Sequence, residues 1–301
     1  MPKKNTLKLM KKKGFIYLMI LPVILYLLVF SYYPLILGII SSFRESRMIG
    51  APEFAGLKNY ADVFGSMYYK QALINTLILG IGTFLMTFVF GLLLALGLNE
   101  LRGRIAKSAI QTVTFLPHLL SWTVVGGMWL NILSSDGLVN GVLKALNMTG
   151  TSGPVIFMSE GSLARPIMII TGAWKGSGYL VVLFMAAIVS IDPSVYEAAA
   201  IDGASRLRQI TSIMVPNLVP TMKTIVVLSS MGILQSFDQI FVMGNQGIYD
   251  KVRTLMYLIY TDGIMEFKVG LATAAATVLL LMTMLISFSV RKLIKYDQSF
   301  I

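Results

Sequence analysis

Two charged side chains, Lys175 and Asp238, lie well inside long apolar stretches of the sequence. A formal charge is costly within a bilayer, so such residues usually face a water-filled cavity or a partner. Aromatic and amide side chains lie near them along the chain: Trp174, Tyr179, Gln235 and Gln239. Aromatic faces suit the apolar C–H surfaces of a sugar, and amides or carboxylates suit its hydroxyl edges. These residues therefore form a candidate pathway for a polar, sugar-like solute.

The same residue types also have structural interpretations. Lys175 and Asp238 can pair across a helix bundle and fix its register, or Lys175 can extend to the membrane interface. Aromatic residues in membrane spans belong to packing or to the interfacial belt more often than to a ligand site. We assign Trp122 and Trp129, seven residues apart, to such packing. His118 directly follows a proline, and we expect it to satisfy a carbonyl freed by a kink.

Several kinds of chemistry are excluded by the residues present. The chain has no cysteine and a single histidine, so thiolate catalysis, disulfides, zinc–thiolate sites and a histidine metal cluster are ruled out. It also lacks G-x-x-x-x-G-K-[ST], the loop that cradles nucleotide phosphates in P-loop ATPases. We therefore expect no ATP hydrolysis and no cofactor on this chain.

The composition predicts a membrane protein. Of the 301 residues, 56% are hydrophobic and 13% charged, with a mean hydropathy of +0.76, whereas a soluble domain has about 25% charged residues. A span needs about 20 apolar residues and must bond its own backbone, so each long apolar segment predicts a helix. Six segments qualify: Phe15–Ser42, Ala72–Leu98, Ile105–Leu133, Pro166–Ser190, Leu218–Met243 and Val269–Val290. We predict an all-α membrane protein with six transmembrane helices.

The basic residues predict the orientation. The net charge is +11, and Lys and Arg gather in the N-terminal tail, the second-to-third and fourth-to-fifth connections and the C-terminal tail. This positive-inside pattern places both termini in the cytoplasm and explains the charge without nucleic acid. The predicted organisation is a basic tail (1–14), a transmembrane domain (15–290) containing a cytoplasmic segment called the elbow (191–217), and a second tail (291–301).

The elbow is longer than a turn requires, and its residues predict two helices. Asp192 is a suitable N-cap, with a proline at the first helical position. Ser194 and Glu197 offer a competing capping box. Gly203 is placed to end the first helix or to bend it. Ser205 can cap the second helix, which we expect to end at the next proline.

The elbow resembles the EAA signature of ABC-importer permeases. Residues 197–204 read E-A-A-A-I-D-G-A, and Ile213 and Pro216 follow. In that family this loop forms a coupling helix that docks on the ATP-binding subunit. The resemblance assigns that role to Glu197, Ala198, Ala199, Asp202, Gly203, Ala204 and Pro216.

Other segments resemble sugar-type members of the same family. They are Phe54–Tyr60, Asn75-Thr76, Leu101–Arg104, Phe115–His118 and Thr171–Tyr179. The resemblance spans about residues 15–300 and is greatest to carbohydrate permeases of the maltose and glycerol-phosphate type, in the oligosaccharide or polysaccharide branch. It implies the six-helix fold of type I importers, in a bacterial cell membrane.

The resemblance also implies partners and a pathway. The partners are a second homologous permease, two ATP-binding subunits that carry ATP and Mg, an extracellular substrate-binding lipoprotein, and a carbohydrate. Maltose-type permeases contact sugar at positions matching Lys175, Gly176 and Tyr179, and Gln235, Asp238 and Gln239 fall in the analogous stretch of the fifth span. A lysine departs from the maltose permease here. It is compatible with an acidic sugar, and Asp238 is equally able to neutralise it.

Three other functions are alternatives. One is an ABC permease for another polar solute. An ion-coupled secondary transporter would need inverted repeats or several intramembrane carboxylates, and the sequence shows one such carboxylate. An intramembrane enzyme would need acids or histidines clustered at one membrane face, and the sequence shows none.

Overall fold

The computed structural model describes three stretches of the chain: residues 14–45, 53–148 and 153–296. These stretches are almost entirely helical, apart from one short antiparallel pair of strands, β1 (Arg44–Glu45) and β2 (Glu53–Phe54). The predicted N-terminal tail lies outside the described residues except for Gly14. Of the predicted C-terminal tail, residues 297–301 also lie outside them.

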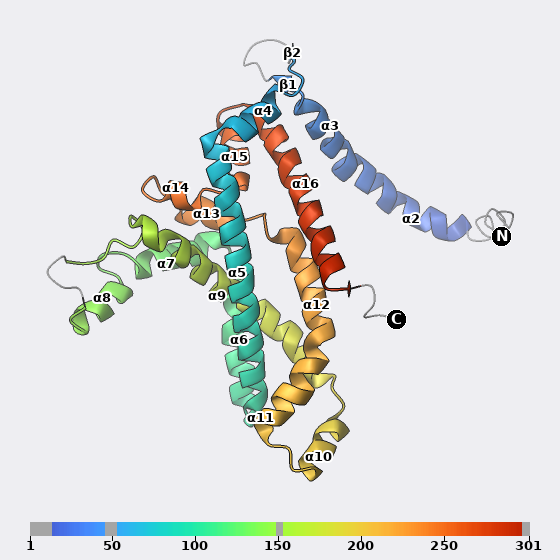
Figure 1. Cartoon of the computed structure of the whole chain (residues 1–301), viewed down its shortest axis with the longest axis vertical. Coiled ribbons are helices and arrows are strands. Elements are labelled where there is room, and N and C mark those ends of the chain that lie inside the picture. Colours follow the sequence, from blue (N-terminus) through green and yellow to red (C-terminus); the bar gives the residue numbers. More distant parts are fainter. Residues whose placement is uncertain (1–13, 46–52, 149–152, 297–301) are drawn as a thin grey trace.

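Figure 1 shows the order and arrangement of the helices. The first half contains α2 (Gly14–Leu27), the π-helix η1 (Leu28–Tyr32), α3 (Tyr33–Ser41), α4 (Lys58–Gly65), α5 (Met67–Glu100), α6 (Arg104–Leu119), α7 (Trp122–Ile132) and α8 (Leu138–Ala145). The second half contains α9 (Gly161–Val189), α10 (Pro193–Ile201), α11 (Arg206–Gln209), the π-helix η3 (Ile210–Met214), α12 (Val215–Gly232), α13 (Asp238–Met243), α14 (Tyr249–Val252), α15 (Leu255–Tyr260), the π-helix η4 (Thr261–Met265) and α16 (Val269–Leu293).

Five helical stretches of the described chain are long and apolar enough to cross a membrane, and a sixth is obtained if one bent pair counts as a span. The first, second, fourth and sixth predicted segments match α2–η1–α3, α5, α9 and α16 to within a few residues at most ends. The sixth continues to Leu293, three residues past its predicted end. The other two predicted segments need correction.

The third predicted segment is not one continuous helix. It breaks between α6 and α7, whose axes differ by 104°. Pro117, inside α6, has no N–H for the helical ladder and obstructs the preceding turn. Leu120 then takes an extended conformation, and the Ser121 hydroxyl caps α7 by accepting a hydrogen bond from the Val124 N–H. A proline near one helix end and a cap at the next start therefore divide the segment.

The fifth predicted segment has both boundaries wrong. Its helix begins earlier, at Arg206, and ends at Gly232, while α13 is a separate short helix. The break is fixed by tertiary contacts, since the Thr254 hydroxyl donates to the Ser236 carbonyl at 2.7 Å. Gly80 of α5 lies so close to the Ile233 carbonyl that a Cβ there would collide with it. The chain can leave the helix here because other elements bond its freed backbone.

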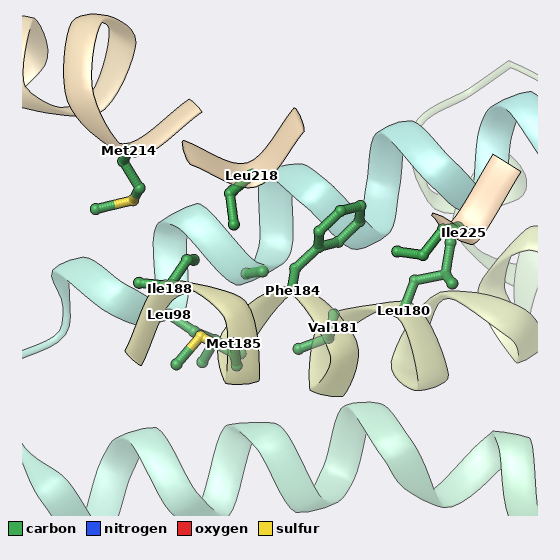
Figure 2. Close-up of a cluster of buried hydrophobic side chains, with 10 residues drawn as sticks. Leu98, Leu180, Val181, Phe184, Met185, Ile188, Met214, Leu218 and Ile225 are labelled. Carbon is green, nitrogen blue, oxygen red and sulfur yellow. The ribbon is translucent and has the colours of Figure 1, made fainter. Parts of the chain in front are cut away.

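Three buried clusters hold the bundle together. The first joins α5, α9 and the η3–α12 region, with Phe184 at its centre and fully buried (Figure 2). The second joins α4, α5, α15 and α16 around Leu255. The third joins α5 and α9 to α13 and α14 around Met168. The long helices α5 and α9 contribute to most of this packing and form the framework for the rest.

The first span lies apart from this bundle. In Figure 1, α2 and α3 extend away from the other helices, and only the α3 end returns to α4 and α16. Within the 28 residues of Gly14–Ser41, no residue of the apolar window is buried. The Asn59 amide anchors the α3 end by donating to the Ser42 and Arg44 carbonyls, both at 2.9 Å.

Candidate functional site

The first helix of the elbow starts as its sequence predicts. The Asp192 carboxylate caps α10 by accepting the Ser194 N–H at 2.9 Å, and Pro193 occupies the first helical position. This hydrogen bond holds the pKa of Asp192 below its usual value, because it stabilises the charged form. The cap is therefore provided by Asp192 and not by the competing box at Ser194.

The turn of the elbow depends on Gly203. Its φ is +73°, a left-handed conformation that glycine adopts without a Cβ penalty. Hydrogen bonds from the Gly203 N–H to the Ala200 carbonyl and from the Ala204 N–H to the Ala199 carbonyl close the end of α10. Ser205 then caps α11, accepting the Arg208 N–H at 3.4 Å.

The second helix of the elbow does not end at Pro216, contrary to the prediction. It continues from α11 through η3 into α12, so the elbow runs directly into the fifth span. Pro216 lies in the first turn of α12, where it has no N–H to offer the ladder. The π-helical turn η3 lies immediately before α12 and accommodates the missing hydrogen bond.

The elbow presents an uncovered surface. No residue of α10 is buried, and Figure 1 shows α10 at the far end of the molecule from α4. Glu197, Ala198 and Asp202 are exposed, and Ala199 and Ala204 are half-buried. Ile201 is 87% exposed and Leu207 71%, so apolar side chains project on both sides of the turn. The turn therefore leaves apolar surface uncovered in the single chain.

An ion pair that sequence reasoning missed fastens the elbow to the bundle. Arg206 Nε lies 2.7 Å from Glu100 Oε2, and Arg206 Nη2 donates to Glu100 Oε1 at 3.0 Å. The same guanidinium donates to the Gln209 amide oxygen at 2.9 Å and lies over the Tyr196 ring. Gln209 in turn donates to the Ala204 carbonyl. Glu100 ends α5, so only the folded chain brings these residues together.

The packing beneath the elbow connects it to the spans. Tyr196 and Ile210 pack against the cluster of Figure 2, which contains Leu98 of α5 and Phe184 of α9. Dense packing of this kind transmits displacement instead of absorbing it. The elbow is therefore in continuous packing contact with α5, α9 and α12.

The second candidate region surrounds the bend between α6 and α7. The Lys175 ammonium donates to the Pro117 and His118 carbonyls at 3.2 and 3.1 Å. Both lie at the end of α6, where carbonyls lack the usual α-helical partners, and the Pro117 carbonyl also accepts the Leu120 N–H at 3.3 Å. His118 therefore does not satisfy a freed carbonyl as expected; its ring stacks on Tyr179, with centroids 5.1 Å apart.

Aromatic side chains complete this region. The Lys175 ammonium lies 5.7 Å from the Trp122 ring centroid, and Trp129 meets Trp174 edge to face at 5.5 Å. We call His118, Trp122, Trp129, Trp174, Lys175 and Tyr179 the bend cluster. Trp174 is 39% exposed and Tyr179 44%, so the cluster has an open side. Trp122 and Trp129 pack as predicted. The side chains that they contact, Lys175 and Trp174, are pathway candidates. The spacing of the residues in the sequence does not indicate these contacts.

The remaining pathway candidates are divided by the fold. Asp238 and Gln235 are exposed, with Asp238 at the start of α13 and Gln235 in the break before it, so neither lies within a span. Asp238 forms no ion pair with Lys175 within the described residues. Gln239 is buried and donates to the Met168 carbonyl and the Thr171 hydroxyl, both at 2.8 Å. Gly176 faces Thr87 across the α5–α9 contact. No group of three acidic or histidine side chains forms a metal site in the described residues.

Comparison with known proteins bears on both regions. Residues 87–296 match the family described as "Binding-protein-dependent transport system inner membrane component". The chain is 31% identical to Protein LplB of Bacillus subtilis, across 90% of this chain and 87% of that protein. It is 30% identical to the polygalacturonan/rhamnogalacturonan transport system permease protein YteP of the same organism, across 90% and 84%.

Solved structures give the same fold. A chain from a bacterial ABC transporter involved in the import of the acidic polysaccharide alginate superposes with a TM-score of 0.85 at 30% identity, covering 97% of this chain and 98% of that one. The same transporter has been solved with an alginate pentasaccharide-bound periplasmic protein, and its chain also superposes at 0.85. The matched residues include the elbow, the bend cluster and α16. The chain therefore belongs to the family of binding-protein-dependent transport system inner membrane components, as a multi-pass, non-catalytic permease subunit of type I importer fold.

Proposed function

We propose that this chain forms half of the translocation pathway of an importer for oligosaccharides in the bacterial cell membrane. Relatives named for polygalacturonan/rhamnogalacturonan and for arabinooligosaccharides support this substrate class. The structural observation that carries the proposal is the elbow. It exposes a capped helix with an apolar tip and connects without interruption to the fifth span.

The elbow would receive its movement from an ATP-binding subunit. Closure of two such subunits, with their ATP and Mg, would press α10 inward, and the packed cluster beneath it would shift α5, α9 and α12. The spans would then open towards an extracellular binding lipoprotein, and ATP hydrolysis would reset them. Both termini and the elbow lie in the cytoplasm in this arrangement, as the basic residues favour.

The pathway would run along the open side of the bend cluster. Trp174 and Tyr179 offer aromatic faces there, and Lys175 offers a polar group. Gln235 and Asp238, exposed around the start of α13, would contribute polar groups farther along the pathway. This surface is exposed in the single chain, so a second, homologous permease would close the other half. Gln239 and Gly176, already engaged between helices, would support the pathway from behind.

Reconstitution tests the proposal. The chain would be co-purified with its second permease and ATP-binding subunits and placed in proteoliposomes with the binding protein. We expect uptake of a labelled oligosaccharide to need ATP, and Tyr179→Ala to lower uptake without changing sugar binding by the isolated binding protein. Uptake driven by an ion gradient without the ATP-binding subunits would overturn the proposal.

A further inference from the structure

Two adjoining hollows lie away from the elbow, where the start of α5 meets α14 and α15. Their volumes are about 450 and 570 Å³. Both are lined by Tyr68, Tyr249 and Arg253, and Tyr257 contributes to the larger one. We call these four residues and the space between them the tyrosine pocket. It is separate from the bend cluster, with which it shares no residue.

Arg253 is a cation held between two aromatic rings. Its guanidinium carbon lies 5.1 Å from the Tyr249 ring centroid and 5.8 Å from that of Tyr68. Its Nε is buried and has no hydrogen-bond partner. Within the described residues, no carboxylate forms an ion pair with it. Because its Nε is buried, this guanidinium can offer a carboxylate or phosphate its two terminal nitrogens, which suit a bidentate pair.

The acidic residues nearby are already engaged or balanced. Asp262 accepts the hydroxyl hydrogen of Tyr69, and Glu266 pairs with Lys268 at 2.6 Å. Asp250 and Lys251 both line the smaller hollow, and their charges offset each other. In the larger hollow Asp262 also lies near enough to interact with Arg253. The smaller hollow carries one net positive charge, that of Arg253, so this part of the pocket favours an anion.

The backbone beneath Arg253 is held rigidly. The Asn75 amide donates to the Arg253 carbonyl at 3.0 Å and to the Asp250 carbonyl at 3.2 Å. Arg165 fixes this amide by donating to its oxygen at 2.7 Å, and donates to the Lys251 carbonyl at 3.0 Å. Because these bonds fix the loop, little ordering cost remains for a ligand that binds there.

The pocket walls suit a sugar. The Tyr257 hydroxyl donates to that of Tyr249 at 2.9 Å, and their rings are 5.1 Å apart. Burial, followed by the bond to Tyr257, raises the pKa of Tyr249 to about 12, so this phenol stays neutral at physiological pH. Neutral phenols provide ring faces for C–H groups and hydroxyls for sugar hydroxyls.

We propose that the tyrosine pocket binds an acidic sugar unit, with its carboxylate on Arg253 and its ring against the tyrosines. The site would hold a uronate-type unit before the chain of sugars enters the pathway, and this rests on the oligosaccharide function proposed above. A phosphate, whether free or from a lipid headgroup, would use Arg253 but leave the tyrosine faces unused.

Direct binding to the whole importer tests this proposal. The permease pair with its ATP-binding subunits would be placed in phosphatidylcholine nanodiscs without binding protein. Binding of trigalacturonate and of neutral maltotriose would be measured by equilibrium dialysis. Arg253→Gln should weaken trigalacturonate binding at least about tenfold and change maltotriose binding by no more than about twofold, since glutamine cannot form the charge-assisted contact with a carboxylate. Arg253→Lys should recover part of the loss.

Lys70→Gln is the matched control, because Lys70 is an exposed cation on α5 that does not line the pocket. It should leave both affinities unchanged. Equal trigalacturonate affinity in the native importer and Arg253→Gln would overturn the site. Added phosphatidylglycerol or inorganic phosphate is tested as a competitor. If either anion displaces trigalacturonate from the native importer, and Arg253→Gln abolishes this effect, the pocket would be assigned to that anion instead.

A separate measurement distinguishes failure of the tyrosine-pocket proposal from failure of the proposed oligosaccharide function. ATP-driven uptake of an oligogalacturonate and of a neutral oligosaccharide would be followed in native proteoliposomes. Uptake of the acidic sugar combined with unaltered binding in Arg253→Gln would reject the pocket and leave the function intact. Uptake of neither class would count against the oligosaccharide function itself.

Discussion

Gly203 has a left-handed backbone conformation, and its importance can be tested separately from steric clash. No atom of the described chain lies within 4 Å of a Cβ built there, so a side chain would fit. Its left-handed φ still costs an ordinary L-residue about 1–2 kcal/mol. We predict that Gly203→Ala lowers binding-protein-stimulated ATP hydrolysis and uptake, while Gly203→Asn, which tolerates this φ better, keeps more of both.

Gly97 supplies the matched control for that prediction. It is exposed within α5 and also has nothing within 4 Å of a built Cβ, but its backbone is helical. Gly97→Ala should therefore leave coupling intact. Full activity of Gly203→Ala would show that the turn does not depend on glycine.

Lys175 is predicted to stabilise the bend as well as to face the pathway. Its ammonium donates to the Pro117 and His118 carbonyls, and hydrogen bonds to charged groups are worth about 1.5–3 kcal/mol each. Lys175→Met should lower the thermal unfolding temperature of the purified importer and reduce uptake, and Lys175→Arg should keep much of both. Lys223→Met, which removes a half-buried lysine with no hydrogen-bond acceptor among the described residues, is the comparison. Equal unfolding temperatures for the two methionine variants would contradict the capping role.

At the scale of elements, a bidentate ion pair adds to the packing that attaches the elbow to α5. Arg206 and Glu100 are about half and one-third exposed, so solvent screens their attraction. We predict a double-mutant coupling energy of about 0.5–1 kcal/mol for the pair. Arg206→Ala or Glu100→Ala should lower uptake per ATP hydrolysed, because α10 would move without carrying α5. The exchange Arg206→Glu with Glu100→Arg should restore part of the ratio, and a ratio unaffected by either single change would contradict this role.

The element boundaries show how far sequence reasoning extends. Four spans and the elbow caps at Asp192, Gly203 and Ser205 follow from hydropathy and local chemistry. Pro117 and Gly232 predict kinks or close helix contacts, but not that the helices end there, because both residue types are tolerated within membrane helices and hydropathy continues across both breaks. Contacts from distant residues stabilise the breaks: Lys175 bonds the end of α6, and Thr254 bonds the segment before α13.

Local sequence likewise identifies some residues of the candidate site and misses others. The coupling residues lie consecutively in the sequence, so a local motif could identify them. The Arg206–Glu100 pair joins residues 106 positions apart, and no local pattern indicates it. Gln239 was a pathway candidate by its position in the sequence, but the fold buries it against α9.

At the scale of the whole molecule, the uncovered first span predicts contact with another chain. It has no buried residue in its apolar window, and the native chain has no cysteine. Single cysteines can therefore be placed around α2 and α3 and labelled with a lipid-soluble maleimide. We predict that one helical face becomes protected when the second permease is co-expressed. If all faces are labelled equally with and without the second permease, this span contacts lipid and not that permease, and the prediction is wrong.

The isolated position of this first helix also has a consequence for biogenesis. A helix that satisfies its own backbone bonds and matches lipid tails needs no neighbour to remain in the bilayer. The cell can therefore release it from the insertion machinery before the rest of the polypeptide is synthesised. Its final docking then becomes a separate event that waits for another polypeptide. The ratio of subunits in the importer would then be controlled when this helix docks and not when it inserts.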